Sequence, residues 1–195
     1  LAVQVGVGEF FSCTLLATGR VLCWGSNYER QLGLPQTTTI TNVGSASNPV
    51  STTPDIVFGD EQTLITEISS SREHSCALST DGRVFCWGYN RRGQLGLNHL
   101  REDADIAAVD LAGRTVVRVF SANLASCVLF DTNDLHCWGN SVADFSQSGP
   151  IFDFGESQSY PAAAAPVIGL DRRWKEHKGG AFSIQSKQHY ACVGN

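Results

Sequence analysis

The chain has 195 residues, 42% of them hydrophobic, and a net charge of −5 at pH 7. Its length is typical of a single domain, residues 1–195, and its apolar content suffices for a packed core. The Lys and Arg residues are scattered, which argues against a nucleic-acid-binding face. No apolar run reaches the roughly 18 residues that a membrane-spanning helix needs.

The first predicted element is a β-hairpin within residues 1–34. Residues 12–25 read SCTLLATGRVLCWG, in which two runs typical of strands flank the turn letters ATG. A three-residue turn with Gly19 in the left-handed conformation places Cys13 opposite Cys23. Opposed residues of paired strands lie about 4.5–5.5 Å apart at Cα, which is within disulfide range.

A polar insertion, residues 35–60, follows the first hairpin. Nine of the seventeen residues from 37 to 53 are Ser or Thr, so this stretch is a candidate for O-linked sugars, with a plain flexible loop as the alternative. We expect the insertion to leave the folded body and to contact neighbouring molecules.

The second hairpin lies within residues 64–97, where HSCALSTDGRVFCWG repeats the pattern. The same turn, with Gly82 left-handed, sets Cys76 against Cys86. A two-residue Asp-Gly turn is the competing register, and it would leave these two cysteines diagonal.

The third hairpin lies within residues 115–140, and SCVLFDTNDLHCWG sets Cys127 against Cys137 with Asn133 at the left-handed position. A second insertion, residues 141–166, follows.

Residues 180–195 begin a fourth repeat that stops after Cys192, whose partner is therefore expected outside this chain. The chain also lacks methionine. Both features predict a segment of a longer polypeptide, or a fold completed by another chain.

The successive first cysteines are 63, 51 and 65 residues apart, and repeats of about 50 residues are typical of propellers and solenoids. Six of the seven cysteines thus form three predicted cross-strand disulfides. Buried free thiols are one alternative. A zinc site using His74 or His136 is another, although the Cys-x9-Cys spacing is not that of a zinc ribbon. Disulfides at this density favour an oxidising compartment.

The segment HSCALSTDGRVFCWGYNRRGQLGL resembles the repeat of the regulator of chromosome condensation family, and RVLCWGSNYERQLGL in the first repeat is similar to it. The third repeat keeps LHCWGN but lacks the Gln-Leu-Gly element. The resemblance implies an all-β fold of four-stranded antiparallel blades, three repeats plus the start of a fourth, within a larger propeller of about seven blades.

In such blades Trp24, Trp87 and Trp138 are expected to pack between neighbouring blades, and a ligand platform is the alternative for them. The family includes a nuclear exchange factor for a small GTPase and the extracellular crinkly-type receptor ectodomains, so the fold leaves the function open. The paired cysteines favour the extracellular kind.

No Ser-His-Asp, paired-carboxylate or phosphate-loop arrangement stands out, so we expect neither an enzyme nor a bound cofactor or metal. The leading prediction is an extracellular or secreted, disulfide-stapled scaffold that binds proteins. The alternative is an intracellular small-GTPase exchange factor or a chromatin-associated regulator.

Overall fold

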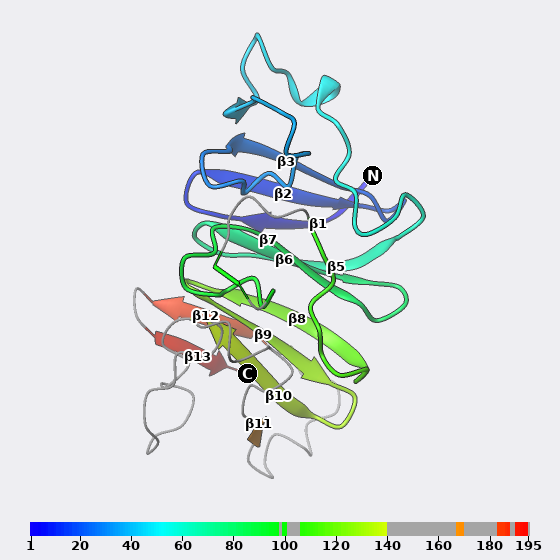
Figure 1. Ribbon diagram of the computed structural model, residues 1–195, viewed down its shortest axis with the longest axis vertical. Helices are drawn as coiled ribbons and strands as arrows, with labels where there is room; N and C mark the ends of the chain where they lie inside the picture. The colour runs from blue at the N-terminus through cyan, green and yellow to red at the C-terminus, as the bar shows by residue number, and fades with distance from the viewer. Residues whose placement is uncertain (98, 101–105, 140–166, 170–182, 188–189, 195) are drawn as a thin grey trace.

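The computed structural model describes residues 1–97, 99–100, 106–139, 167–169, 183–187 and 190–194. The described residues form four antiparallel β-sheets, of which the first three lie one after another along the long axis of the molecule, while the fourth, two-stranded sheet lies beside the third (Figure 1). Each sheet is built from strands that are close in sequence, as expected for successive blades of a propeller. The prediction of an all-β fold made of such blades is confirmed.

The first sheet has the strand order β1-β2-β3-β4. Its strands are β1 (Ala2–Val7), β2 (Phe11–Leu16), β3 (Val21–Ser26) and β4 (Asn42–Val43). The second sheet contains β5 (Ile65–Ser70), β6 (His74–Ser79) and β7 (Val84–Gly88). An isolated bridge between Phe85 and Ala108 occupies the position of its fourth strand. Among the described residues, the fourth strand predicted for every blade is represented here by this bridge.

The third sheet has the order β11-β10-β9-β8. It comprises β8 (Val116–Ala122), β9 (Ala125–Phe130), β10 (Asp134–Gly139) and β11 (Val167–Gly169). Two strands, β12 (Ser183–Lys187) and β13 (Tyr190–Gly194), form the fourth sheet. The strands thus follow the predicted repeats, and the boundaries given to the repeats stay a prediction.

The hydrophobic core lies between the sheets. One cluster joins the first two blades and includes Phe11, Leu32 and Phe85. A second cluster joins the second and third blades and includes Val84 and Val128. Each blade is too thin to bury its own side chains, so face-to-face stacking provides the apolar burial.

The expectation that residues 35–60 leave the folded body is wrong for both ends of this segment. Val43 forms part of strand β4 and is buried, and Phe58 is buried with its ring centroid 5.3 Å from that of Trp87. Between them, an exposed loop and the 3-10 helix Val50–Thr52 form the excursion at the top of Figure 1. Only this middle part extends away from the blades. The second predicted insertion, residues 141–166, lies outside the described residues.

Within the described ranges, no helix is both long enough and apolar enough to cross a membrane.

Candidate functional site: the faces and interfaces of the blades

The three hairpins have the predicted left-handed turn residues. The backbone φ angle is 79° at Gly19, 83° at Gly82 and 62° at Asn133. In the second hairpin, the N–H of Ser79 donates to the carbonyl of Arg83 (2.9 Å) and closes a three-residue loop. This register, and not the two-residue alternative, determines which residues face each other along each hairpin.

The register brings the six paired cysteines together. Cys13 faces Cys23, Cys76 faces Cys86 and Cys127 faces Cys137, with Cα separations of 4.1, 4.1 and 4.0 Å, and each pair is disulfide-bonded in the structure. All six residues are buried. The bonds lie inside the stack of blades, where each one closes a hairpin.

Two of the three tryptophans that follow the second cysteine of a hairpin lie between blades and bind the preceding blade. Nε1–H of Trp87 donates to the carbonyl of Gln31 (3.0 Å), and Nε1–H of Trp138 donates to the carbonyl of Gln94 (2.9 Å). These two side chains are 2% and 0% exposed. Trp24 occupies the same position in the first blade, but it is only partly buried. For the described blades, the structure therefore places Trp87 and Trp138 in packing positions.

The loop that receives each tryptophan is held by the Asn and Gln of its own motif. Asn90 Oδ1 accepts from the N–H of Leu95 (3.0 Å), and Gln94 Oε1 accepts from the N–H of Arg92 (3.0 Å). Asn27 and Gln31 make the corresponding bonds in the first blade. The motif thus fixes the backbone carbonyl that accepts the indole N–H.

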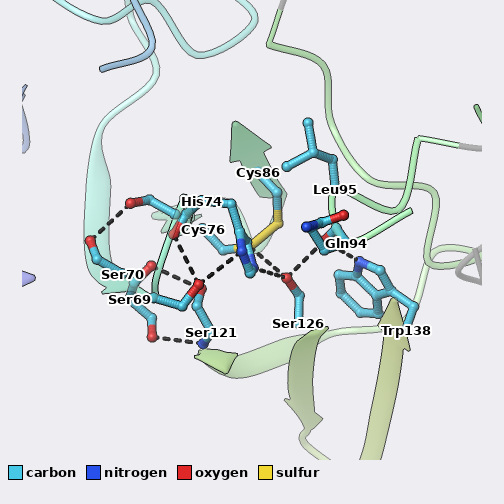
Figure 2. The surroundings of a disulfide bond; sticks show 12 residues. Ser69, Ser70, His74, Cys76, Cys86, Gln94, Leu95, Ser121, Ser126 and Trp138 are labelled. Atoms are coloured by element: carbon cyan, nitrogen blue, oxygen red, sulfur yellow. Dashed lines mark hydrogen bonds between the residues drawn. A yellow bond between two sulfur atoms is a disulfide. The ribbon is translucent and has the colours of Figure 1, made fainter. Parts of the chain in front are cut away.

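A buried polar chain crosses from the second blade to the third beside the Cys76–Cys86 disulfide (Figure 2). The His74 ring lies 2.8 Å from the Ser71 hydroxyl at Nδ1 and 2.9 Å from the Ser126 hydroxyl at Nε2. The Ser126 hydroxyl donates to the carbonyl of Gln94 (2.8 Å), so it accepts from His74 Nε2–H.

Burial lowers the pKa of His74 from 6.5 to about 3, because the charged ring would lose its hydration. His74 is therefore neutral at physiological pH. With Nε2 as its donor, its Nδ1 accepts from Ser71. Both ring nitrogens are occupied by serine hydroxyls, which leaves neither for a metal. In the described residues, no group of three or more potential ligands is placed to hold a metal ion.

We call the first strand of each blade, β1, β5 or β8, its inner strand. The inner strands of neighbouring blades are joined by side chains that bind main-chain groups. Gln4 Nε2 donates to the carbonyl of Ile68 (2.7 Å), and Gln4 Oε1 accepts from the N–H of Ile68 (2.9 Å). One blade later, Glu67 accepts from the N–H of Val119 (3.1 Å) and from Arg118 Nε (2.7 Å). We call this arrangement the inner-strand clamp. Sequence reasoning missed it, although Gln4 and Glu67 both directly precede the β-branched residue that marks each repeat.

A hollow of about 340 Å³ opens between the first two blades. Its wall includes Arg30, Gln36, Val57, Trp87 and Ile106. Arg30 has a φ of 60° at the loop position where the second blade has Gly93, with a φ of 72°. The wall mixes a cation, amide groups and apolar side chains, which suits contact with a protein segment.

Cys192 lies in β13 opposite Gln185, and its side chain is outside the described part of the structure. The prediction that it pairs outside this chain stays a prediction.

Blades with this geometry define a class of repeat propeller, and comparison with known sequences identifies its family. The Regulator of chromosome condensation (RCC1) repeat matches residues 18–78 and 81–122, and a second profile of the same repeat matches residues 2–31 and 65–94. The chain belongs to the RCC1 repeat family.

Two curated relatives show how this chain compares in length. It is 31% identical over 191 residues to the RCC1 domain-containing protein RUG3, mitochondrial, of Arabidopsis thaliana, a match that covers 97% of this chain and 39% of the relative. It is 29% identical to the human probable E3 ubiquitin-protein ligase HERC3, covering 78% of this chain and 12% of the relative. The chain therefore spans well under half of either protein.

Solved structures support the same fold. The crystal structure of human WBSCR16 superposes with a TM-score of 0.63 at 19% identity, covering 87% of this chain and 40% of that one. Yeast RCC1 (Prp20), solved bound to Kap60, superposes with a TM-score of 0.60 at 17% identity, covering 80% of this chain and 36% of that one. At such identities the likeness concerns the fold alone.

Proposed function

We propose that this chain is part of a larger RCC1-type propeller that works as a non-catalytic, protein-binding scaffold in an extracellular or secreted setting. The observation that carries the proposal is the pairing of cysteines at the same position of three consecutive hairpins.

The redox state of a cellular compartment decides whether such cysteine pairs form stable disulfides. Glutathione and thioredoxin keep cytosolic and nuclear thiols reduced, whereas secreted proteins form stable disulfides. On the chain-entropy model, a disulfide that closes a loop of this length stabilises the fold by up to about 3 kcal/mol. Three such bonds would matter to a fold whose hairpin strands are only five or six residues long.

The ion pairs and contact surfaces of the described residues support the scaffold role. The charged groups there form structural ion pairs, such as Arg83 with Asp81 (2.7 Å) and Arg114 with Asp134 (3.1 Å). The hollow between the first two blades and the excursion at residues 44–53 remain as candidate contact surfaces. Yeast Prp20, which shares the fold, has been solved with Kap60 and is described as binding Gsp1p and histones.

An intracellular exchange factor or chromatin-associated regulator is the second candidate. The likeness to a mitochondrial relative over 97% of this chain favours an intracellular setting. The two candidates differ in the state of their thiols, which makes one measurement decisive.

The test is peptide mapping of protein isolated from its native source and alkylated during lysis, without reductant. We expect peptides that link residue 13 to 23, 76 to 86 and 127 to 137, each pair two hydrogens lighter than its reduced form. Alkylation of all six cysteines before any reduction would overturn the extracellular assignment and favour the intracellular candidate. The same peptides report whether residues 37–53 carry O-linked sugars, which we also propose.

A further inference from the structure

The hollow between the first two blades has a wall that carries a positive charge and no negative one. Arg30 is its cation, and no Asp or Glu is found among the described residues that line it. The chain as a whole has 19 acidic residues against 14 Lys and Arg, which gives it a net charge of −5. The charge of this wall is therefore opposite to that of the whole chain.

The backbone of Arg30 indicates that the side chain at this position has a role. Arg30 has a φ of 60°, and the same loop position in the second blade is Gly93, with a φ of 72°. A residue other than glycine is disfavoured in this left-handed conformation, and such residues cluster at functional sites. A glycine at position 30 would form the same loop without that cost, so the cost supports a role for the Arg30 side chain.

The Arg30 guanidinium has donors to spare. Within the described ranges, its one hydrogen bond runs from Nη1 to the carbonyl of Thr38, at a long 3.4 Å. Nε and Nη2 have no partner in that part of the chain, and no carboxylate there forms an ion pair with this side chain. A guanidinium whose fork of N–H groups is open binds a carboxylate through two parallel hydrogen bonds.

The rest of the wall suits a large apolar side chain. Val57 is 48% exposed, and Leu97 and Ile106 are partly exposed. The volume of about 340 Å³ is at the lower end of the range for ligand pockets. The hollow can therefore take a short segment of one or two side chains, whereas a folded surface is too large for it.

We propose that this hollow binds a short peptide segment of a partner protein, in which one Asp or Glu lies within two residues of a large apolar residue. The carboxylate pairs with the Arg30 guanidinium, and the apolar side chain lies against Val57, Leu97 and Ile106. The proposal rests on the proposed function, since it names the chemistry of one partner that the scaffold binds.

A nucleic acid fits this hollow less well than an acidic peptide. Binding a nucleic-acid strand requires several cations that neutralise successive phosphates. Arg30 is the one Lys or Arg among the described residues that line the hollow, and apolar residues surround it. One carboxylate beside one apolar group matches this arrangement.

The experiment selects a phage-displayed random octapeptide library on the native full-length polypeptide with its disulfides intact. The most enriched sequence is then synthesised with a fluorescein label, and its affinity is measured by fluorescence anisotropy. We expect the enriched sequences to share an Asp or Glu within two residues of a large apolar residue. Replacing that acid by its amide in the synthetic peptide should weaken binding to the unchanged protein by about tenfold or more.

Two variants of the wall test the site itself. Arg30→Gly should weaken binding of the same peptide by about tenfold or more. Because it copies Gly93, its urea midpoint should be equal to or above that of the unchanged protein, which separates lost binding from lost folding. Val57→Ser should weaken binding by about threefold or more.

Two matched variants outside the hollow are the controls. Val117 is 42% exposed and does not line the hollow, and Arg72 pairs with Glu9 (2.6 Å) away from it. Val117→Ser and Arg72→Ala should each change the affinity by less than about twofold.

Several results would overturn the inference. They are a selection that enriches no sequence, enriched sequences that lack an acid, and a peptide that binds Arg30→Gly as tightly as the unchanged protein. None of them bears on the state of the cysteines. The proposed function is therefore judged separately, by the disulfide mapping.

Discussion

Gly88 provides a sharp test of how closely two neighbouring main-chain segments approach each other within the second blade. This residue follows Trp87 and has a φ of 107°, and Gly25 and Gly139 have φ values of 105° and 100° at the same position of their repeats. A Cβ at position 88 would lie 2.5 Å from the carbonyl oxygen of Glu73 and 2.9 Å from Cα of His74. Both are main-chain atoms, which move only together with a strand.

The Gly88→Ala substitution therefore has two costs. The left-handed backbone disfavours any side chain by about 1–2 kcal/mol. Moving the neighbouring main chain adds roughly 1–3 kcal/mol, as overpacking of a well-packed interior does. We expect the free energy of unfolding to fall by about 2–5 kcal/mol.

The matched control is Gly82→Ala. Gly82 has a φ of 83°, but no atom lies within 4 Å of a Cβ placed there. Only the backbone cost of about 1–2 kcal/mol applies. Urea unfolding of both variants, with the disulfides intact and the m-value checked for constancy, measures the difference. Equal losses at the two positions would refute the claim that position 88 is closed by main-chain contacts.

Three further substitutions test the packing. Trp87→Phe keeps most of the apolar area but removes the donor to Gln31, so urea unfolding should show a loss of about 1–2 kcal/mol; no loss would show that the bond is dispensable. The pKa of His74 is about 3 in the folded state, below its unfolded value of 6.5. The stability that neutral His74 provides is therefore complete above about pH 6.5. The free energy of unfolding then falls by about 1.4 kcal/mol per pH unit as the pH drops toward 3. In His74→Phe, which copies the residue at position 11, that part of the acid slope in urea midpoints should vanish, and its persistence would contradict the assignment. Phe58→Ala should lower the free energy of unfolding by about 3–5 kcal/mol, because Phe58 is buried. Replacing the exposed Ser45–Asn48 by a short glycine turn should lower it by less than about 0.5 kcal/mol. Similar losses of stability in thermal unfolding would mean that the excursion is part of the core.

The hairpins could be predicted from the sequence because their determinants are local. A turn whose third residue is Gly or Asn sets the register, and the register then places every cysteine of a pair. Repetition made the inference stronger, since three independent turns gave the same alignment. The observed pairing of Cys76 with Cys86 and of Ala77 with Phe85 follows that register.

The return of residues 35–60 to the body could not be predicted in the same way. Strand β4 has only two residues, Asn42–Val43, which is too short to show the alternation typical of a strand. Phe58 is buried because it meets Phe85 and Trp87 of the next blade, with ring centroids 5.7 and 5.3 Å away. Those contacts depend on how two blades stack, and nothing in the insertion itself indicates them.

The polar side chains at the interfaces were also missed, since Gln, Glu, Ser and His in a strand ordinarily indicate a solvated face. Ser126 and His74 are both fully buried, yet each has hydrogen-bond partners. Each partner belongs to another blade or to a turn, so it is distant in sequence or in register. Only the recurrence of Gln4 and Glu67 before a β-branched residue gave a signal that could have been used.

These interfaces combine two kinds of interaction with different roles. Apolar contacts between the sheets are non-directional, and they would tolerate a blade that slides by a residue. The clamp of Gln4 on Ile68 and the bond from Trp87 to Gln31 are directional. A slip of one residue would leave the buried indole N–H of Trp87 and the partly buried amide of Gln4 without their partners. The apolar core therefore holds the blades together, while the side-chain bonds to main-chain groups fix the register of one blade against the next.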